Sequence, residues 1–120
     1  MATSSATLEH LRELLAPVGA ISVRRMFGGA GIYCDGLMFG LVADDTLYFK
    51  ADDRNRPAFE AESMSPFAYE KKGGQVAIMS FWRAPERLLD EPDELAGWAR
   101  EALAAAHRAA SAKPKRPKPR

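Results

Sequence analysis

The pattern of apolar and polar positions over residues 24–50 predicts three short β-strands joined by two tight turns. Asp35-Gly36 separates the first two runs and favours a two-residue hairpin, because a type I′ turn needs positive φ at both central positions. Asp44-Asp45 indicates a second, weaker turn. Strict alternation in the middle run would place Leu37, Phe39, Leu41 and Ala43 on one face and Met38, Gly40 and Val42 on the other. Neither face is polar, so we expect this strand to be covered on both sides.

Two further apolar runs, residues 67–71 and 75–82, surround Lys72-Gly73-Gly74 and predict a second hairpin. The later run is apolar on both faces, which indicates a central strand. The aromatic residues of this hairpin, with nearby Lys71, Lys72 and Arg83, also fit a stacking platform for nucleic acid. Their spacing follows the strand period, so core packing is the favoured interpretation. Residues 21–27 predict an edge strand, protected from pairing by its arginines.

Helical spacing appears in three places along the chain. Residues 7–16 repeat leucine on one stripe, with Ser4 or Ser5 as the N-cap and Pro17 at the end. Residues 52–62 predict a short helix, capped by Asp52 or Asp53, with Phe59 as its anchor on the sheet. If Pro57 lies in the first turn, the helix begins later, near Asn55. Residues 85–89 predict one helical turn. A long helix over 92–110 would bury one stripe, made of Leu95, Trp98, Ala99, Ala102, Leu103 and Ala106.

Together these elements predict an α+β fold. We expect a mainly antiparallel sheet of about five strands in two hairpin units, packed with N-terminal, middle and long C-terminal helices. At 120 residues the chain fits one domain, assigned to residues 1–110, followed by a disordered Pro-rich tail over residues 111–120.

Charge is distributed unevenly between the domain and the tail. The net charge is +1, but the last ten residues hold five of the 17 basic residues and no acid. The remainder is therefore mildly acidic, unlike a domain that binds duplex DNA. The five tail cations predict weak, salt-sensitive association with nucleic acid, and the alternative is a solubilising end; they are Lys113, Lys115, Arg116, Lys118 and Arg120.

No residue set in the sequence amounts to a catalytic, metal or cofactor site. Gly28–Gly31 resembles a phosphate loop only superficially, because a hairpin turn rather than a helix follows; a bend with close backbone approach is the simpler interpretation. The paired aspartates lack the spacing of a calcium loop. The candidate catalytic side chains lie on different elements and show no motif order, and we assign no catalytic residue among Cys34, Tyr33, Asp35, His10 and His107.

The single cysteine, Cys34, is expected to be a small packed side chain and fits a reducing cytoplasm, since it has no partner for a disulfide within the chain. We find neither a secretory leader nor an apolar run long enough to span a bilayer. The expected location is therefore cytoplasmic, without a membrane partner.

Several segments in order resemble the TfoX/Sxy N-terminal domain family. They are residues 24–29 (Arg-Arg-Met-Phe-Gly-Gly) with the Gly31-Ile32-Tyr33 strand, then residues 37–42, 47–50, 67–69 and 85–98. The resemblance covers about residues 8–108 and implies a cytoplasmic α+β domain. It also implies a link to competence regulators, which act on transcription together with a cyclic-AMP receptor protein and are not known as enzymes. It covers the first of the two domains that such regulators have, and this sequence then continues as the basic tail.

The leading hypothesis is thus a non-enzymatic regulatory domain that binds a protein, by resemblance a part of the transcription machinery. Arg24 and Arg25 are the candidate contact surface; the alternative is that they are ordinary edge-strand charges or pair with the acidic body. Two other hypotheses remain: nucleic-acid association through the tail, and a small enzyme of unknown chemistry. The sequence does not define the oligomeric state.

Overall fold

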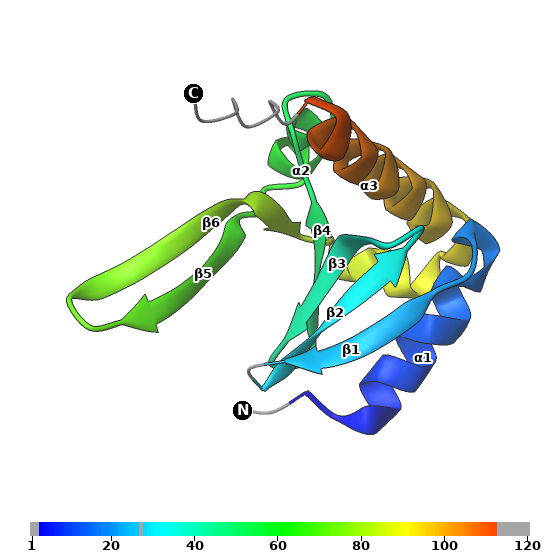
Figure 1. Ribbon diagram of the computed structural model, residues 1–120, viewed down its shortest axis with the longest axis horizontal. Helices are drawn as coiled ribbons and strands as arrows, with labels where there is room; N and C mark the ends of the chain where they lie inside the picture. Colours follow the sequence, from blue (N-terminus) through cyan, green and yellow to red (C-terminus); the bar gives the residue numbers. More distant parts are fainter. Residues whose placement is uncertain (1–2, 27, 113–120) are drawn as a thin grey trace, which may run out of the picture.

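The computed structural model of the chain describes residues 3–26 and 28–112, which form one antiparallel sheet with helices on one side of it (Figure 1). The sheet has six strands in the order β1-β2-β3-β4-β6-β5, so the α+β fold is confirmed with one strand more than expected. The strands are β1 (Ser22–Met26), β2 (Gly29–Cys34), β3 (Leu37–Ala43), β4 (Thr46–Lys50), β5 (Pro66–Lys71) and β6 (Gly74–Arg83). The helices are α1 (Ser5–Leu15), α2 (Arg56–Ala61) and α3 (Pro92–Ala112), with 3-10 turns η1 (Ala16–Val18) and η2 (Glu86–Asp90).

Local signals placed most of these elements correctly. Ser4 caps α1, because its side chain accepts a hydrogen bond from the Thr7 N–H. Asp35 and Gly36 have φ of 56° and 76°, and Asp44 and Asp45 have φ of 51° and 60°, so both predicted turns are confirmed. The long helix continues to Ala112, two residues beyond its expected end at residue 110. The tail cations at 113–120 and Phe27 lie outside the described residues.

One hydrophobic core lies between the sheet and the two longer helices. It combines the leucine stripe of α1, the small-residue stripe of α3 and the strand side chains that point toward them, including Ile32, Phe39, Val42, Phe49 and Trp82. Phe59 anchors α2 on this core as predicted, with its ring centroid 5.0 Å from that of Trp98. We call this covered side of the sheet the inner face and the opposite side the outer face.

The expectation that β3 is covered on both sides is wrong. Phe39 and Val42 are both fully buried on the inner face, whereas Met38 and Leu41 are only half-buried. The cause is a β-bulge: Ile32 pairs with Gly40 but Tyr33 pairs with Met38, so Phe39 is an extra residue. An inserted residue shifts the alternation by one place, and strict alternation from the sequence therefore assigned half of the strand to the wrong face.

Gly29 permits the close approach that its glycine-rich segment predicted. A Cβ at this position would collide with the main-chain carbonyl oxygen of Val42, which belongs to β3 and cannot swing aside. Gly29 lies in β2 directly after the β1–β2 turn, with no helix following it. The structure therefore supports the bend rather than a phosphate loop.

The middle helix begins at Arg56, as expected for Pro57 in its first turn, with Asn55 rather than Asp52 or Asp53 at the N-cap position and no side-chain capping hydrogen bond. Asn55, which is only 7% exposed, precedes α2, and its Oδ1 accepts a hydrogen bond from the Asp52 N–H at 2.7 Å. Its Nδ2 donates to the Lys50 carbonyl oxygen at 3.0 Å. Both ends of a buried amide are thus satisfied, and Asn55 fixes the path of the chain from β4 into α2.

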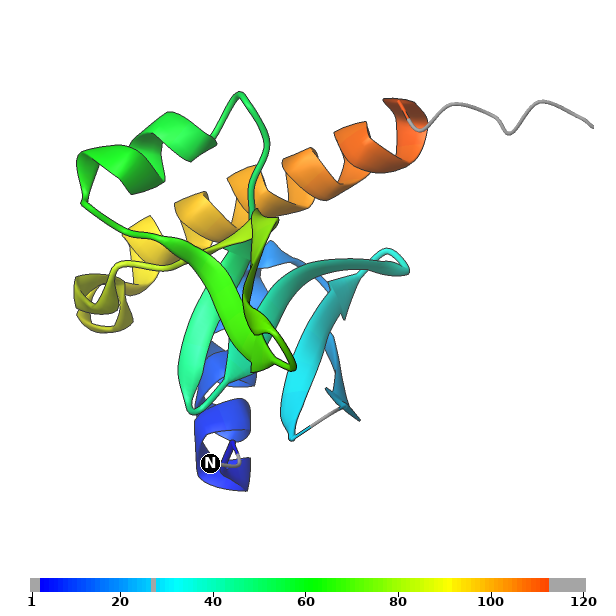
Figure 2. The ribbon, with the colours of Figure 1, turned by 90° about the vertical axis from the view of Figure 1, so that its left-hand side faces the viewer.

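Strands β5 and β6 form an arm that projects from the rest of the sheet (Figures 1 and 2). Only Phe81, Trp82 and Arg83 of β6 pair with β4, whereas residues 74–78 pair with β5. A register shift between Pro66, which pairs with Trp82, and Phe67, which pairs with Ile78, separates the arm from the sheet. The strand β6 is central in the order as predicted, but its first half has a neighbour on one side only.

Candidate interaction surface on the outer face of the sheet

A row of directly opposed residues crosses the outer face over five strands. Arg24 pairs with Gly31, Gly31 with Leu41, Leu41 with Tyr48 and Tyr48 with Arg83. Opposed residues in an antiparallel sheet point to the same side. We call these five residues the outer row. Both arginines are exposed and Leu41 and Tyr48 are half-buried, and among the described residues the core includes no member of the row.

Gly31 allows the side chains around the row to meet. A Cβ at Gly31 would lie 2.7 Å from Met38 Sδ, 2.9 Å from Met26 Cε and 3.0 Å from Tyr33 Cε1. The Arg24 guanidinium lies 5.3 Å from the Tyr33 ring centroid, a cation–π contact. Lys50 covers the Phe81 ring in the same way, also at 5.3 Å. The outer face therefore offers methionine and aromatic surface together with positive charge.

A groove of about 800 Å³ lies between the arm and the ends of β1 and β3. Residues 41–44 form one wall and residues 67–70 of β5 the other, with Met26, Gly28 and Gly29 between them. Phe67 connects the groove to the outer row, since its ring packs edge-on against Tyr48 with the centroids 5.0 Å apart. Two of these described lining residues, Asp44 and Glu70, are charged, and both are acidic.

The predicted contact pair Arg24 and Arg25 is divided between the two faces. Arg24 belongs to the outer row. Arg25 points the other way: its Nη1 donates to the Thr3 carbonyl oxygen at 3.0 Å and its Nη2 to Ser5 Oγ at 3.1 Å. The side chain of Arg25 thus holds the start of α1 against the sheet. Only Arg24 of the two lies on the outer face.

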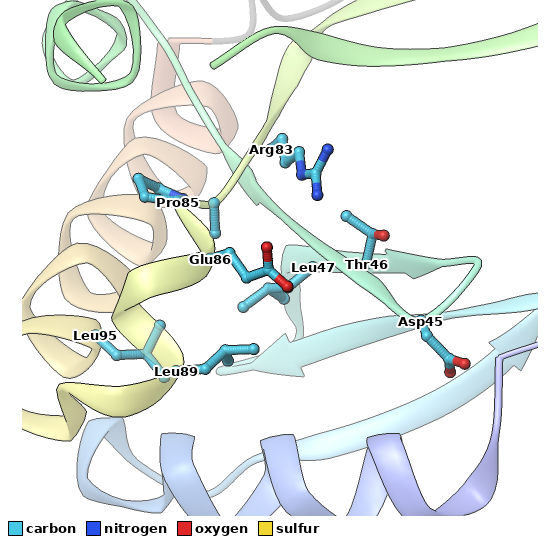
Figure 3. A pocket seen from close by; sticks show the side chains of 9 residues that line it. Asp45, Thr46, Leu47, Arg83, Pro85, Glu86, Leu89 and Leu95 are labelled. Carbon is cyan, nitrogen blue, oxygen red and sulfur yellow. The ribbon is translucent and has the colours of Figure 1, made fainter. Parts of the chain in front are cut away.

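A second, much smaller cavity of about 50 Å³ lies beside β4 and η2 (Figure 3). Leu47, Leu89 and Leu95 form its apolar side, and the Glu86 side chain points from η2 toward β4 (Figure 3). Its volume holds about one or two water molecules. Arg83, the end of the outer row, also lines this cavity.

Of the side chains considered for catalysis, the described part of the structure pairs His107 with Asp35 but joins neither histidine to Cys34 by a hydrogen bond. Cys34 is buried on the inner face, and burial raises the pKa of its thiol, with the neighbouring Asp35 as a second cause. In residues 3–26 and 28–112, no hydrogen bond joins Cys34 to His10 or His107. His107 Nε2 instead lies 3.1 Å from Asp35 Oδ2, which links α3 to the β2–β3 turn. A raised pKa disfavours the reactive thiolate.

Potential metal ligands do not gather either. Within the described part of the chain, no group of three or more His, Cys, Asp or Glu side chains is placed to hold an ion. The described helices also include none with the length and hydropathy required to cross a bilayer. What the structure offers as a candidate site is the outer row with the groove beside it. The sequence signal that could have indicated this site is the aromatic and methionine content of the strands. One layer of helices covers only one face of a sheet, so some of these side chains must lie on the other face.

The fold is an antiparallel sheet whose inner face is covered by helices, and the candidate site lies on its outer face. The model of the TfoX N-terminal domain matches residues 13–106, and the chain is a member of that family. The predicted resemblance is thereby confirmed. The chain is also 28% identical over 100 residues to the DNA transformation protein TfoX1 of Aliivibrio fischeri. That match covers 80% of this chain and 47% of the relative, so the chain spans about half the length of this similar protein.

Proposed function

We propose that this chain is a non-enzymatic regulatory domain of DNA transformation that works by binding a protein through the outer row. The family and the name of the relative, a DNA transformation protein, support the process. The resemblance to competence regulators supports a partner in the transcription machinery of the cytoplasm. The observation that carries the proposal is the row itself, an apolar and aromatic centre with an exposed arginine at each end.

The chemistry of the row suits a protein partner. Interface centres are enriched in tyrosine, methionine and arginine and depleted in other charged residues. Tyr48, Leu41, Met38 and Tyr33 provide such a centre, and Arg24 and Arg83 provide a cationic rim. A partner surface with an apolar patch flanked by carboxylates would complement it.

The test combines capture with a transformation assay. The gene is deleted in its own host and restored with the wild type, with Leu41→Glu, or with the control Glu101→Ala, which changes an exposed helix position. We expect Leu41→Glu to lose both the transformation phenotype and one transcription protein recovered by affinity capture, while Glu101→Ala keeps both. A folded Leu41→Glu protein with normal transformation and capture would refute the proposal.

A second candidate function rests on the charge of the sequence rather than on the sheet. Five cations without an acid between residues 113 and 120 would neutralise a few phosphates and give weak, sequence-independent association with nucleic acid. This function would add to protein binding, because the tail and the outer row are separate parts of the chain.

A further inference from the structure

The unpaired edge of β5 forms one wall of the groove. β5 is the last strand in the sheet order, so among the described strands one of its edges has no neighbour. Four consecutive residues, 67–70, line the groove. Successive side chains of a strand point to opposite faces, so a wall made of consecutive residues is the edge of the strand, where main-chain N–H and C=O groups are presented. Such an edge is a template for another strand.

The arm has the properties of a strand pair that lacks a neighbour. Two-stranded ribbons are marginally stable alone in water. Two of the large hydrophobic side chains that the fold leaves exposed lie on the arm, Tyr69 at 43% and Met79 at 54%. Neither a proline nor a bulge interrupts the edge over residues 67–71, since Pro66 precedes the register shift and the pairing over these residues is regular.

The sequence of β5 is compatible with itself in one antiparallel register. Opposed residues must point to the same face, so the two-fold axis lies between the two copies of one residue, which oppose each other. An axis at Tyr69 places Phe67 opposite Lys71 and Ala68 opposite Glu70, and uses all of residues 67–71. An axis at Glu70 would oppose two carboxylates, which is destabilising. An axis at Ala68 would place Glu70 opposite Pro66. It would also leave Lys71 outside the regular pairing.

We propose that β5 pairs antiparallel with β5 of a second copy of this chain, with Tyr69 at the two-fold axis, so that each arm lies in the groove of the other. Charge supports this occupant. The groove presents the acidic Asp44 and Glu70, and the arm that enters it brings Lys71 and the turn residue Lys72. The two sheets then form one continuous sheet, and the exposed Tyr69 side chains cover each other.

This inference goes beyond the proposed function and is separable from it. Leu41 belongs to both the outer row and the wall of the groove, so Leu41→Glu can affect both. Arg24 and Arg83 belong to the row and do not line the groove, whereas Tyr69 lines the groove and is not in the row, so Arg24→Ala tests the row alone. A dimer can therefore be absent while the row binds its partner, and the row can be inactive in an intact dimer.

Cysteine cross-linking tests the register directly. Opposed residues of an antiparallel pair have Cα atoms about 4.5–5.5 Å apart, within the range of a disulfide. Tyr69→Cys and the control Met79→Cys are made in the full chain carrying Cys34→Ala, and both are treated with oxidised glutathione, which is reduced as the disulfide forms. We expect the Tyr69→Cys chain to become a covalent dimer at least tenfold faster than the Met79→Cys chain. Equal rates, or no dimer from Tyr69→Cys, would overturn the register.

Sedimentation equilibrium tests the association without a covalent bond. The mass of the wild-type chain should rise from 13.2 kDa toward twice that value as its concentration increases into the millimolar range. Tyr69→Lys opposes two cations at the axis and should weaken association at least tenfold, whereas Met79→Lys should not. A wild-type chain that stays monomeric at every concentration overturns the proposal. The same holds if that monomer binds a peptide of another protein in its groove.

Discussion

Arg108 holds the carboxylate of Asp52 with two hydrogen bonds, from Nε at 2.7 Å and from Nη2 at 2.9 Å. The same carboxylate accepts the main-chain N–H of Arg54 at 3.0 Å. One acidic side chain thus joins the last turns of α3 to the segment between β4 and α2. The pKa of Asp52 falls to about 2, first because of the hydrogen bonds from Arg108 and further because of the main-chain donors.

This pair predicts a specific acid sensitivity. A carboxyl group with a lowered pKa stabilises the fold above its unfolded pKa, near 3.8, and loses this contribution as the pH falls toward about 2. With both side chains partly exposed, we expect Asp52→Asn to cost about 1 kcal/mol at pH 7 and little at pH 2. Urea unfolding at several pH values measures this difference. A cost that does not depend on pH would contradict the assignment.

The two strand glycines should respond differently to the same added methyl group. Gly29→Ala drives a Cβ into the carbonyl of Val42, which is main chain, so we expect a loss of about 2–3 kcal/mol. Gly31→Ala meets the ends of Met26 and Met38, which can rotate away, so we expect a loss of about 1 kcal/mol or less. Thermal unfolding of both variants decides the order. A greater loss for Gly31→Ala would mean that the methionine side chains are rigid.

Truncating each arginine of the 24–25 pair should separate binding from stability. Arg25→Ala removes the hydrogen bonds to Thr3 and Ser5, so we expect a loss of about 1 kcal/mol and faster hydrogen exchange at the start of α1. Arg24→Ala removes an exposed cation from the outer row, so we expect a stability change within about 0.5 kcal/mol and weaker capture of the partner. Calorimetry and capture with both variants measure the two effects. The proposed surface is wrong if only Arg25→Ala reduces capture in a folded protein.

Deleting residues 113–120 should remove the cationic part of the chain and leave the domain intact. We expect the full chain to be retained on immobilised DNA at low salt and released as salt increases, and the shortened chain to elute without retention. A matched variant with glutamine at the five tail cations keeps the length of the chain. Retention of either variant would place nucleic-acid binding on the folded domain instead.

Local features of the sequence predicted the elements well, because turns and helix stripes depend on neighbouring residues. Asp35-Gly36 and the leucines of α1 are examples. The bulge at Phe39 could not be predicted, since a bulge depends on how two strands pair rather than on the composition of one. The link between Asp52 and Arg108 spans 56 positions and has no local signature.

The candidate site shows the same division. The sequence places Arg24 in a predicted edge strand, and the structure puts it at the end of the outer row. Its neighbour Arg25 was grouped with it because sequence proximity does not say which face each side chain takes. The aromatic residues of β5 were assigned to the core because their spacing is that of a strand. The period of a strand reveals two faces, but only the packing of helices decides which face is covered.

The extra residue at Phe39 changes the inward and outward alternation of side chains along β3. On the Leu37–Met38 side of it, odd-numbered positions point inward, and on the Leu41–Val42 side even-numbered positions do. Deleting this one residue would therefore reverse the orientation of part of the strand, sending an apolar anchor to the solvent or a surface residue into the interior. A change of one residue in length, with every other residue retained, would alter both what the domain displays and what holds it together.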